Sequence, residues 1–426
     1  MAEKSTVSDA AQGPLHGLKV LDLTSVVLGP YATQILGDYG ADVVKVEPLD
    51  GDLMRANGVS RTPGMSSIFL SINRNKRSIA LDLKAKEGRD IFLALAERSD
   101  IVLHNMRQPA VERLDISYEA VRARNERIIY CAATGFGQSG PDRNKPAFDD
   151  IIQSACGLAS LNRLDGTGPQ YVPTLIADKT VGMAVVSAVL AALYSRTQTG
   201  RGQYIEVPML ETMVEFVMVE HLGGLTFDPP EGPPGYQRIS NGGRRPVPTS
   251  DGYVTMLPYS PRNWTELFST LGREDLLHTF DLSSRHAVNA SVKELYQQLA
   301  KITPQKNTEE WLRTCEVLDI PATALFRLED LQEHPHLKAV EHFQTMEHPS
   351  EGLIRFVKPS TVFSRTPARV HRGAPCLGQD TDAVLAELGY SPADIETLLS
   401  KKIILRGSVP YPIDSPTLPA KAMVSP

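Results

Sequence analysis

Apolar residues follow two different periods in the first half of the chain. Runs rich in β-branched residues predict strands at residues 18–24, 41–47, 78–83, 101–105 and 127–134. The stretches between them repeat apolar positions every three or four residues, which predicts helices at residues 29–40, 86–100 and 117–126. A further helix over about 180–196 leads into a strand at 203–210. Strands that alternate with helices of this length form βαβ units, so we predict an α/β fold with a parallel sheet and helices on both faces.

This periodicity is lost at residue 223. The next thirty residues, GGLTFDPPEGPPGYQRISNGGRRPVPTSDG, are rich in Gly and Pro and indicate a long linker or loop. Helical patterns then predict a smaller domain, followed from about residue 340 by mixed strands and by a helical pair at 380–402. We therefore predict a flexible N-terminus at residues 1–14 and the first part of a large domain at 15–222. A linker with the small domain follows at 223–335, and the chain returns to the large domain at 336–405. Residues 406–426 form a Pro-rich tail.

Composition narrows the cellular setting. A formal net charge of −6 argues against nucleic acid as a partner, because phosphate binding requires a basic surface. The chain has four cysteines and no C-x-x-C pair, which fits a reducing compartment. Residues 1–14 lack the apolar core of a signal peptide, and the apolar stretch at 181–194 is shorter than the ~20 residues that span a bilayer. We predict a cytoplasmic protein with no membrane segment.

Two motifs resemble cofactor or metal sites without the context that such sites require. GFGQSG at residues 135–140 matches G-x-G-x-x-G, but turn-forming residues follow it where a dinucleotide-binding helix would begin, so we predict a glycine loop. His334, His336, His342 and His348 fit no zinc template in their spacing, and we predict solvent-exposed loop histidines and no metal. Nucleophile-elbow and P-loop motifs are absent from the sequence, which disfavours hydrolases and P-loop enzymes.

A basic segment gives two open interpretations. Arg74, Lys76, Arg77 and Lys84 surround a short strand-like run. They form either a solvated basic edge or a site for a phosphate-rich ligand, since cations beside free strand-end amides suit phosphates.

One carboxylate, Asp178, precedes the small residues of the most apolar helix, in the stretch TLIADKTVGM. A helix N-terminus at this point would stabilise its negative charge. Asp is also a common N-cap, and composition and spacing alone favour that simpler interpretation.

Six ordered blocks together point to a family. They read GLKVLDLTSVVLGPYATQILGDYGADVVKVEP, NRNKRSIALDLKAKEG, IIYCAATGFGQSGP, AFDDIIQSACGLAS, LAALYSRTQTGRGQYIEVPMLE and LGQDTDAVLAELGYS. Over residues from about 15 to 400 they resemble the signature blocks of the class III CoA-transferases, the formyl-CoA transferase family. The resemblance implies a Rossmann-like large domain built from both chain ends, a smaller α+β domain and an interlocked homodimer. It also implies coenzyme A and acyl-CoA as substrates, with no permanently bound cofactor.

The resemblance implies one catalytic carboxylate, and Asp178 matches its block. Asp178 would attack the acyl-CoA carbonyl to form a mixed anhydride, and the CoA thiolate would then form an aspartyl-CoA thioester for transfer to a carboxylic acid. Amides near the helix start and in the glycine loop would hold the oxyanions. By position, the resemblance assigns CoA binding to Val27, Leu28, Leu81, Asp82, Leu83, Lys84, Asn105, Met106, Arg107, Arg113 and Lys145.

The sequence also departs from the formyl-CoA enzyme pattern. Pro48 stands where that enzyme has an Arg, with Arg55 as a candidate replacement, and Val27 stands at a Gln position. Residues 241–245, Asn-Gly-Gly-Arg-Arg, replace a glycine-rich loop, which puts oxalate and formate in doubt as substrates. Two adjacent arginines suit a second carboxylate such as that of succinate, whereas the simpler interpretation is a solvated basic loop. The residues assigned to the substrate are accordingly Gly242, Gly243, Arg244 and Arg245.

Two alternatives to CoA transfer stay open. α-Methylacyl-CoA racemases share the fold and pair the Asp with a His; here Phe148 stands at that position, and Phe cannot move a proton. A CoA-binding protein without catalysis is the other. We predict a transferase that moves CoA from an acyl-CoA donor to a carboxylic acid, with itself as its only macromolecular partner.

Overall fold

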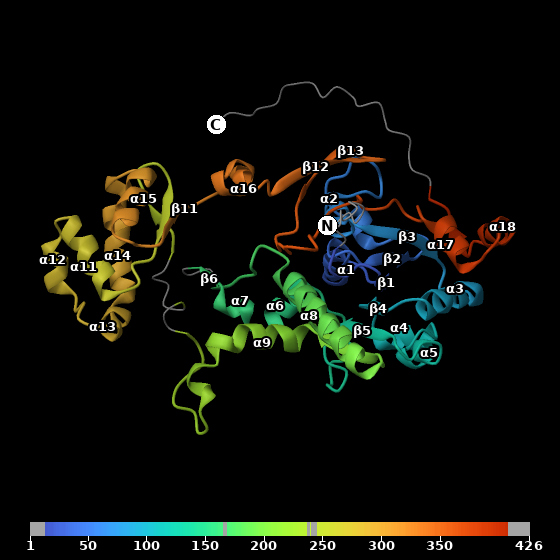
Figure 1. The fold of residues 1–426 in the computed structure, drawn as a ribbon. Helices are drawn as coiled ribbons and strands as arrows, with labels where there is room; N and C mark the ends of the chain where they lie inside the picture. The colour runs from blue at the N-terminus through green and yellow to red at the C-terminus, as the bar shows by residue number, and fades with distance from the viewer. Residues whose placement is uncertain (1–12, 165–167, 237–238, 240–244, 408–426) are drawn as a thin grey trace, which may run out of the picture. The chain divides into compact units, whose positions relative to one another are not determined.

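The computed structural model describes residues 13–164, 168–236, 239 and 245–407 (Figure 1). The chain forms two compact units, the first from Met1–Val217 with Glu341–Pro426 and the second from Met218–Val340. Apart from residues 242–245, every site residue predicted from the sequence belongs to the first unit. Of those four, Gly242, Gly243 and Arg244 lie outside the described residues.

A sheet of seven strands forms the centre of the first unit. Its spatial order is β14 (Ile404–Leu405), β3 (Lys76–Leu81), β2 (Asp42–Glu47), β1 (Lys19–Leu23), β4 (Ile101–His104), β5 (Ile129–Thr134) and β8 (Gln203–Pro208). Neighbouring strands are parallel, except that β14 runs antiparallel to β3. The β-branched runs of the sequence form these strands because a parallel strand that is covered on both faces needs apolar side chains on each.

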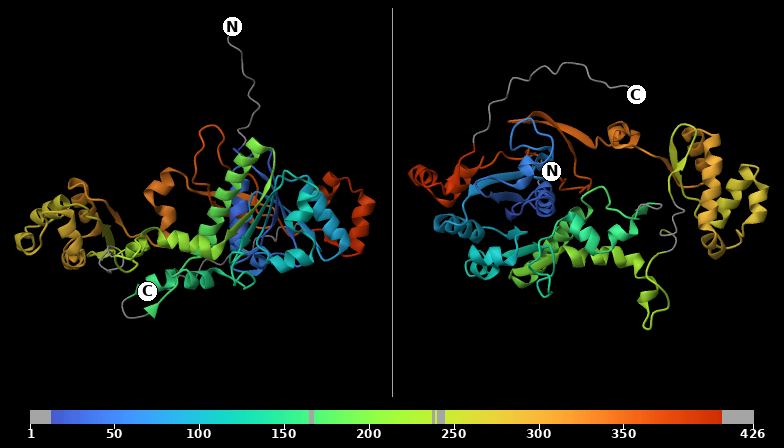
Figure 2. Two further views of the ribbon diagram at one scale, coloured as in Figure 1. Left: turned by 90° about the horizontal axis from the view of Figure 1, so that it is seen from below. Right: turned by 180° about the vertical axis from the view of Figure 1, so that it is seen from behind.

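Helices cover both faces of the sheet (Figure 2). One core joins the sheet to α1 (Leu28–Asp38), α6 (Asp149–Ala155) and α8 (Ile176–Thr199). The core on the other face joins it to α3 (Lys86–Glu97), α5 (Tyr118–Arg122), α17 (Thr381–Leu388) and α18 (Pro392–Ser400). The predicted α/β fold, with a parallel sheet between two layers of helices, is confirmed.

Helix α8 is long and apolar enough to cross a membrane when judged by length and mean hydropathy alone. In the structure it packs along α1, and Ala177, Val181 and Val189 are buried in the core that both helices share. Gly182 permits this close approach, because a Cβ at that position would lie 2.8 Å from the carbonyl oxygen of Leu28. Helix α8 is therefore a core helix of the first unit.

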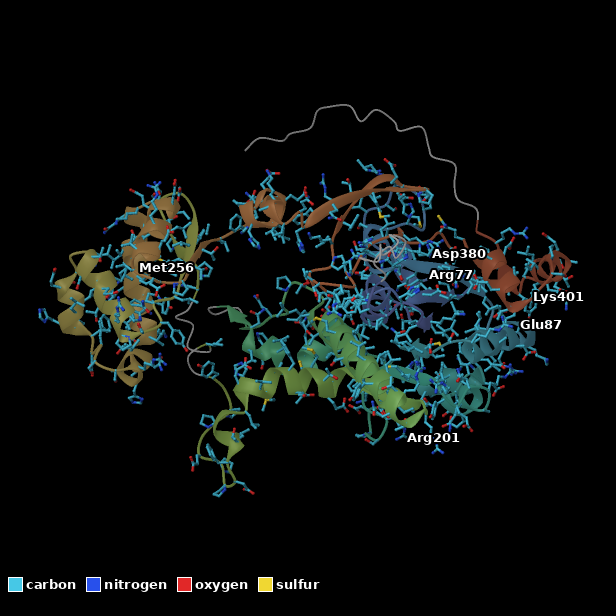
Figure 3. The ribbon with its side chains drawn as sticks, in the orientation of Figure 1. Arg77, Glu87, Arg201, Met256, Asp380 and Lys401 are labelled. Atoms are coloured by element: carbon cyan, nitrogen blue, oxygen red, sulfur yellow. The ribbon has the colours of Figure 1, made fainter. Side chains whose placement is uncertain are left out.

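The chain returns to the first unit through the antiparallel hairpin of β12 (Phe343–His348) and β13 (Gly352–Val357). The predicted helical pair follows as α17 and α18 and leads to β14 at the sheet edge. Ion pairs fasten this return to the first part of the chain: Arg77 with Glu387 at 2.6 Å, and Lys401 with Glu87 at 3.1 Å (Figure 3).

The second unit has its own apolar core. It contains a three-stranded antiparallel sheet of β11 (Ala322–Ala324), β10 (Tyr253–Met256) and β9 (Val247–Pro248). Its main helices are α11 (Pro261–Thr270), α14 (Val292–Ile302) and α15 (Thr308–Val317). Trp264 and Trp311 are fully buried among them.

Candidate active site

The strand order reverses between β1 and β4, because β2 and β3 lie on one side of β1 whereas β4 and β5 lie on the other. In open α/β sheets, ligands bind beyond the carboxyl ends of the strands at such a reversal. Asn105 follows β4 at this point and bonds to the backbone after β1: its Nδ2 donates to the carbonyl oxygen of Ser25 at 2.7 Å, and its Oδ1 accepts from the Ser25 amide at 3.0 Å. Val27, buried, follows two residues later. The structure thus brings two of the predicted CoA-binding segments together.

The remaining predicted CoA-binding residues follow other strands of the same sheet. Residues 81–84 end β3 and turn toward α3, with Lys84 exposed. Arg107 follows β4 and donates from Nη1 to the carbonyl oxygen of Asn144 at 3.5 Å, so it lies beside the exposed Lys145 of the loop after β5. Arg113 is exposed at the end of α4 (Gln108–Arg113). All four of these cations are exposed, whereas the side chain of Asn105 is hydrogen-bonded to Ser25.

Asp178 lies in the first turn of α8 and is only 7% exposed. The residue at the N-cap position is Leu175, so the interpretation of Asp178 as an ordinary N-cap is wrong. A second carboxylate, Asp149 at the start of α6, accepts from the Asp178 amide at 2.9 Å through Oδ1 and from Gln153 Nε2 at 2.6 Å through Oδ2. Asp149 therefore takes over the capping role, and the side chain of Asp178 is left for other chemistry.

The environment of Asp178 favours its protonated form. Burial, and to a lesser extent the negative charges of Asp149 and Asp150, together raise its pKa to about 7. Among the described residues, no lysine or arginine forms an ion pair with Asp178. A pKa of about 7 leaves this carboxyl group only partly ionised at neutral pH, so the helix start alone does not keep it ionised as we expected. A buried carboxyl group with a strongly raised pKa is a typical functional-site feature.

A cavity of about 780 Å³ lies between α1, α8 and the β12–β13 hairpin; Lys179, the residue after Asp178, lines it, whereas Asp178 itself does not. Val27 and Tyr31 from α1 line it together with Lys179 and Met183 from α8, and the β12–β13 hairpin closes another side. Lys179 directly follows Asp178, and its Nζ donates to Thr174 Oγ1 at 2.6 Å. Ligand pockets usually measure about 300–1,000 Å³, so this cavity has the size of a small-molecule site.

The loop of GFGQSG contains no helix start, which confirms the predicted glycine loop. Its amides, however, are already bonded: Gly137 donates to Glu211 Oε1 at 2.9 Å and Gln138 donates to Glu206 Oε1 at 2.6 Å. Because carboxylates occupy these two amides, they are not placed to stabilise an oxyanion as we expected.

The basic segment of residues 74–84 is, as a whole, neither a solvated edge nor a phosphate site. Lys76 is fully buried and pairs with Asp22 at 3.0 Å, and Arg74 pairs with Asp38 at 2.7 Å. Arg77 binds Asp42 through two hydrogen bonds at 3.0 and 2.7 Å. These cations hold the sheet and its helices together.

Arg55 and His348 also have structural roles. Arg55, the candidate replacement for a CoA contact, is buried and bonded to both carboxylate oxygens of Glu47, at 2.8 and 2.7 Å. His348 is only 3% exposed and bonds to the carbonyl oxygen of Ala374, so the prediction of a solvent-exposed loop histidine is wrong there. Within the described residues, no group of His, Cys, Asp and Glu is suited to a metal ion.

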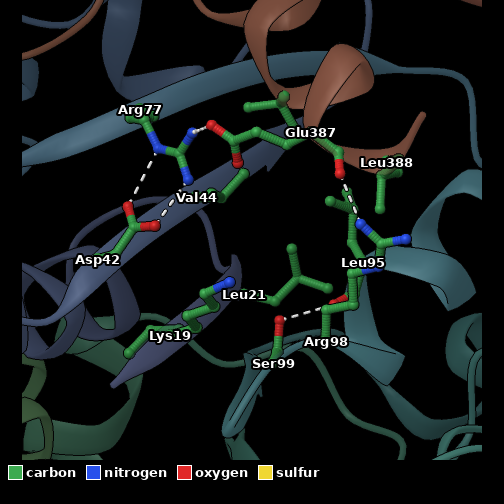
Figure 4. A pocket seen from close by; sticks show the side chains of 12 residues that line it. Lys19, Leu21, Asp42, Val44, Arg77, Leu95, Arg98, Ser99, Glu387 and Leu388 are labelled. Atoms are coloured by element: carbon green, nitrogen blue, oxygen red, sulfur yellow. Dashed lines mark hydrogen bonds and ion pairs between the residues drawn. The ribbon is translucent and has the colours of Figure 1, made fainter. Parts of the chain in front are cut away.

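A separate cavity of about 320 Å³ lies between the sheet and helices α3 and α17 (Figure 4). Lys19 and Asp42, which begin β1 and β2, line it, so it opens near the amino ends of the strands. Its arginines are already bonded, Arg77 to Asp42 and Glu387 and Arg98 to the carbonyl oxygen of Glu387. This cavity is therefore a poor candidate for phosphate binding.

Sequence reasoning missed the residues that support the site. Asp149 was not predicted, because nothing in AFDDIIQ shows that its carboxylate reaches α8. Lys45 and Asp52 form a fully buried ion pair at 2.8 Å close to Val26, and their spacing in the sequence gives no signal of it.

Comparison with known proteins decides the family. A profile of CoA-transferase family III matches residues 15–381. The chain belongs to this family. It is 31% identical to the succinate–glutarate CoA-transferase of Agrobacterium fabrum over 88% of this chain and 96% of that protein. It is 28% identical to the formyl-CoA:oxalate CoA-transferase of Escherichia coli O157:H7, over 90% of this chain and 98% of that protein. The crystal structure of a CaiB/BaiF family protein from Brucella suis superimposes with a TM-score of 0.76 at 27% identity, covering 88% of this chain and all of that one. This family III protein is therefore a CoA-transferase that uses CoA thioesters as substrates.

Proposed function

We propose that this CoA-transferase moves CoA from an acyl-CoA donor to a dicarboxylic acid through a covalent aspartyl-CoA thioester on Asp178. The observation that carries the proposal is the buried carboxyl group of Asp178 in the first turn of α8, directly before Lys179, which lines the 780 Å³ cavity. A carboxylate that ionises in a desolvated site is an activated nucleophile toward a thioester.

The chemistry balances in four steps. An Asp178 oxygen attacks the thioester carbonyl carbon, and the C–S bond breaks to give a mixed anhydride and a CoA thiolate. The thiolate attacks the Asp178 carbonyl carbon, which releases the donor acid and leaves aspartyl-CoA. The acceptor carboxylate then attacks this thioester and expels the thiolate, which finally attacks the acyl carbon of the new anhydride. The product is a new acyl-CoA and free Asp178.

CoA binding is proposed at the reversal of strand order between β1 and β4. The backbone of Val27 and Leu28 would contact the thioester arm near α8, and residues 81–84 with Asn105 and Met106 would line the path of the nucleotide. Arg107, Arg113 and Lys145 would meet the phosphates, because exposed cations on separate loops bind phosphate oxygens strongly.

Covalent labelling tests the nucleophile. The protein is incubated with succinyl-CoA, trapped with hydroxylamine and mapped by peptide mass spectrometry. We expect the hydroxamate at Asp178, and Asp178→Asn should lose transfer while it still binds CoA. The control is Asp150→Asn, which removes an exposed carboxylate at the start of α6 and should still be labelled at Asp178. Unlabelled wild-type protein that binds CoA would favour a non-catalytic CoA-binding protein.

The dicarboxylate acceptor is proposed from the names of two relatives, which transfer CoA to glutarate or oxalate, and from the arginines of residues 241–245. Arg244 and Arg245 would bind the second carboxylate, with Gly242 and Gly243 close to the substrate. Arg245 is exposed. Arg244→Ala and Arg245→Ala should each raise KM for glutarate more than KM for succinyl-CoA. Equal KM values in the variants and the wild type would remove both arginines from the substrate site.

Racemisation is the second candidate within the same fold. Phe148, 59% exposed at the N-cap of α6, stands where a paired base would be required, so we propose that α-proton exchange is absent. Incubation of the wild type with a 2-methylacyl-CoA in D₂O tests this: incorporation of deuterium at the α-carbon would revive the racemase.

A further inference from the structure

Val26 has a backbone conformation that its side chain opposes. Its φ angle is +69°, in the left-handed region, which β-branched residues very rarely adopt. The other non-glycine residues with positive φ among the described residues are Asn, Asp, Glu or Lys, and none is β-branched. Val26 belongs to the turn of residues 24–27, here named the β1 turn, at the carboxyl end of β1 where the strand order reverses.

Side chains from other segments hold the first three residues of the β1 turn. Lys45 Nζ donates to the carbonyl oxygen of Thr24 at 2.7 Å. Asn105 bonds to both backbone groups of Ser25. Asp52 Oδ1 accepts from the Val26 amide at 3.2 Å. Since these anchors come from β2, from the segment after β2 and from the end of β4, their convergence on three consecutive residues compensates the unfavourable conformation.

The anchor at Val26 depends on a second contact. The other carboxylate oxygen of Asp52 accepts from Lys45 Nζ at 2.8 Å, and both side chains are fully buried. Asp52 therefore joins the Val26 amide to the same lysine that holds Thr24. Removal of either contact would release the turn toward an ordinary conformation with negative φ.

The turn sets the position of the backbone that lines the cavity and packs against α8. Val27 is the N-cap of α1 and has no side-chain hydrogen bond to fix it. It lines the 780 Å³ cavity together with Lys179, the residue after Asp178. The next carbonyl group, that of Leu28, contacts Gly182 one helical turn beyond Asp178. A change of φ at Val26 would therefore move the cavity wall opposite Lys179 and the backbone that packs against Gly182.

We infer that Asp52, Lys45 and Asn105 are positioning residues, which hold Val26 in the left-handed conformation so that the backbone of Val27 and Leu28 is preset for the thioester arm of acyl-CoA. This inference rests on the proposed binding of CoA at the β1–β4 reversal. A preset backbone binds ground state and transition state alike, so its loss raises KM more than it lowers kcat.

The test is a rescue experiment on CoA affinity. Asp52→Asn keeps the size of the side chain but leaves one acceptor oxygen, which cannot serve Val26 and Lys45 separately. We expect the dissociation constant of CoA and KM of succinyl-CoA to rise by about 10-fold or more, with kcat falling much less. Val26→Gly should then restore affinity in the double variant to within about 3-fold of wild type, because glycine adopts positive φ without a steric cost.

A matched control separates this effect from general stabilisation. Lys402, exposed after α18, is also a non-glycine residue with positive φ, at 56°. Lys402→Gly in the Asp52→Asn protein should raise thermal stability by the same mechanism and leave CoA affinity at the weakened value. If Asp52→Asn does not fold, Asn105→Ala replaces it, since this variant leaves no buried charge unpaired.

The outcomes distinguish this inference from the proposed mechanism. Failure of Val26→Gly to restore affinity in a folded variant, or equal restoration by Lys402→Gly, would overturn the positioning role. CoA affinity does not require Asp178, so the same rescue is expected in the Asp178→Asn background. If Asp178 is not the nucleophile, no hydroxamate will form at Asp178, but Val26→Gly will still restore CoA affinity.

Discussion

At the scale of single residues, Asp178 shows which of several opposing effects determines ionisation. The helix start favours a negative charge, whereas burial and the charges of Asp149 and Asp150 oppose it. The opposing effects are larger, because the pKa of Asp178 is raised to about 7. Near neutral pH the carboxyl group is therefore divided between its neutral and ionised forms, and an ionised carboxylate of high pKa is more basic and more nucleophilic.

The pH dependence of turnover follows from this pKa. Because the nucleophile must be ionised, kcat/KM of the free enzyme should rise through an acid limb near pH 7. Asp149→Asn removes the nearer charge and should move that limb to lower pH, while its side-chain oxygen still accepts from the Asp178 amide. Asp150→Asn should move the limb less, since Asp150 contributes less to the pKa shift. Identical acid limbs in all three proteins would assign the titration to another group.

Stability should depend on the same carboxyl group in the opposite sense. Its pKa is higher in the folded protein than its ordinary 3.8, so its contribution to stability is present at acid pH and is lost as pH rises toward 7. Asp178→Asn removes this loss and should raise the free energy of unfolding by roughly 4 kcal/mol at pH 8. At pH 4 the difference should nearly vanish. Thermal melts at both pH values measure it, and a constant difference between variant and wild type would contradict the raised pKa.

At the scale of elements, the sequence predicted the helices that bury one face and the strands that are buried on both faces. The strands of the parallel sheet and helices α1 and α3 were recognised because their apolar positions follow the period of the element. Helix α9 (Met209–His221) was missed, since MLETMVEFVMVEH has apolar residues around its circumference and leaves Val214 and Phe216 exposed in this chain. Such a helix has no single apolar face to reveal its period.

Of the candidate site, the sequence predicted the nucleophile but not the residues that hold it in place. Asp178 was identified through its block of sequence, but its partner Asp149 was not, because a hydrogen bond between carboxylate and amide across 29 residues has no local pattern. Val26 was equally hidden. Sequence rules expect Gly or Asn at positive φ, so a valine there is visible only in the structure.

The crossing of α1 and α8 yields a prediction about packing. Gly182→Ala would place a Cβ 2.8 Å from the Leu28 carbonyl oxygen and 3.1 Å from the Tyr31 ring, and backbone must shift to relieve the first contact. We expect a loss of about 1–3 kcal/mol in the free energy of unfolding and weaker CoA binding, although alanine favours helix formation. The control Ala191→Ser, at an exposed position of α8, should change neither the free energy of unfolding nor CoA binding by much. Denaturant titration and CoA binding measure the two effects, and a more stable Gly182→Ala protein would show that the helices do not touch as described.

At the scale of the whole molecule, several large apolar side chains on α8 and α9 of the first unit are exposed. Met183 and Tyr194 of α8 and Val214 and Phe216 of α9 are all exposed. Exposed apolar side chains that gather into one patch mark a protein interface, and we propose that these four form such a patch. It supports our proposal that two chains associate as a homodimer, as the resemblance implies.

Light scattering coupled to size exclusion tests the homodimer. The wild type should have twice the 46.6 kDa mass of the chain, because burial of these side chains would stabilise the association by about 25 cal/mol per Å² of apolar surface. Tyr194→Glu combined with Phe216→Glu places charges in the interface and should shift the mass toward one chain. Val59→Glu changes a single apolar residue of similar exposure outside α8 and α9, and it should leave the dimer intact. A wild-type mass of 46.6 kDa with full activity would show that one chain forms the complete enzyme.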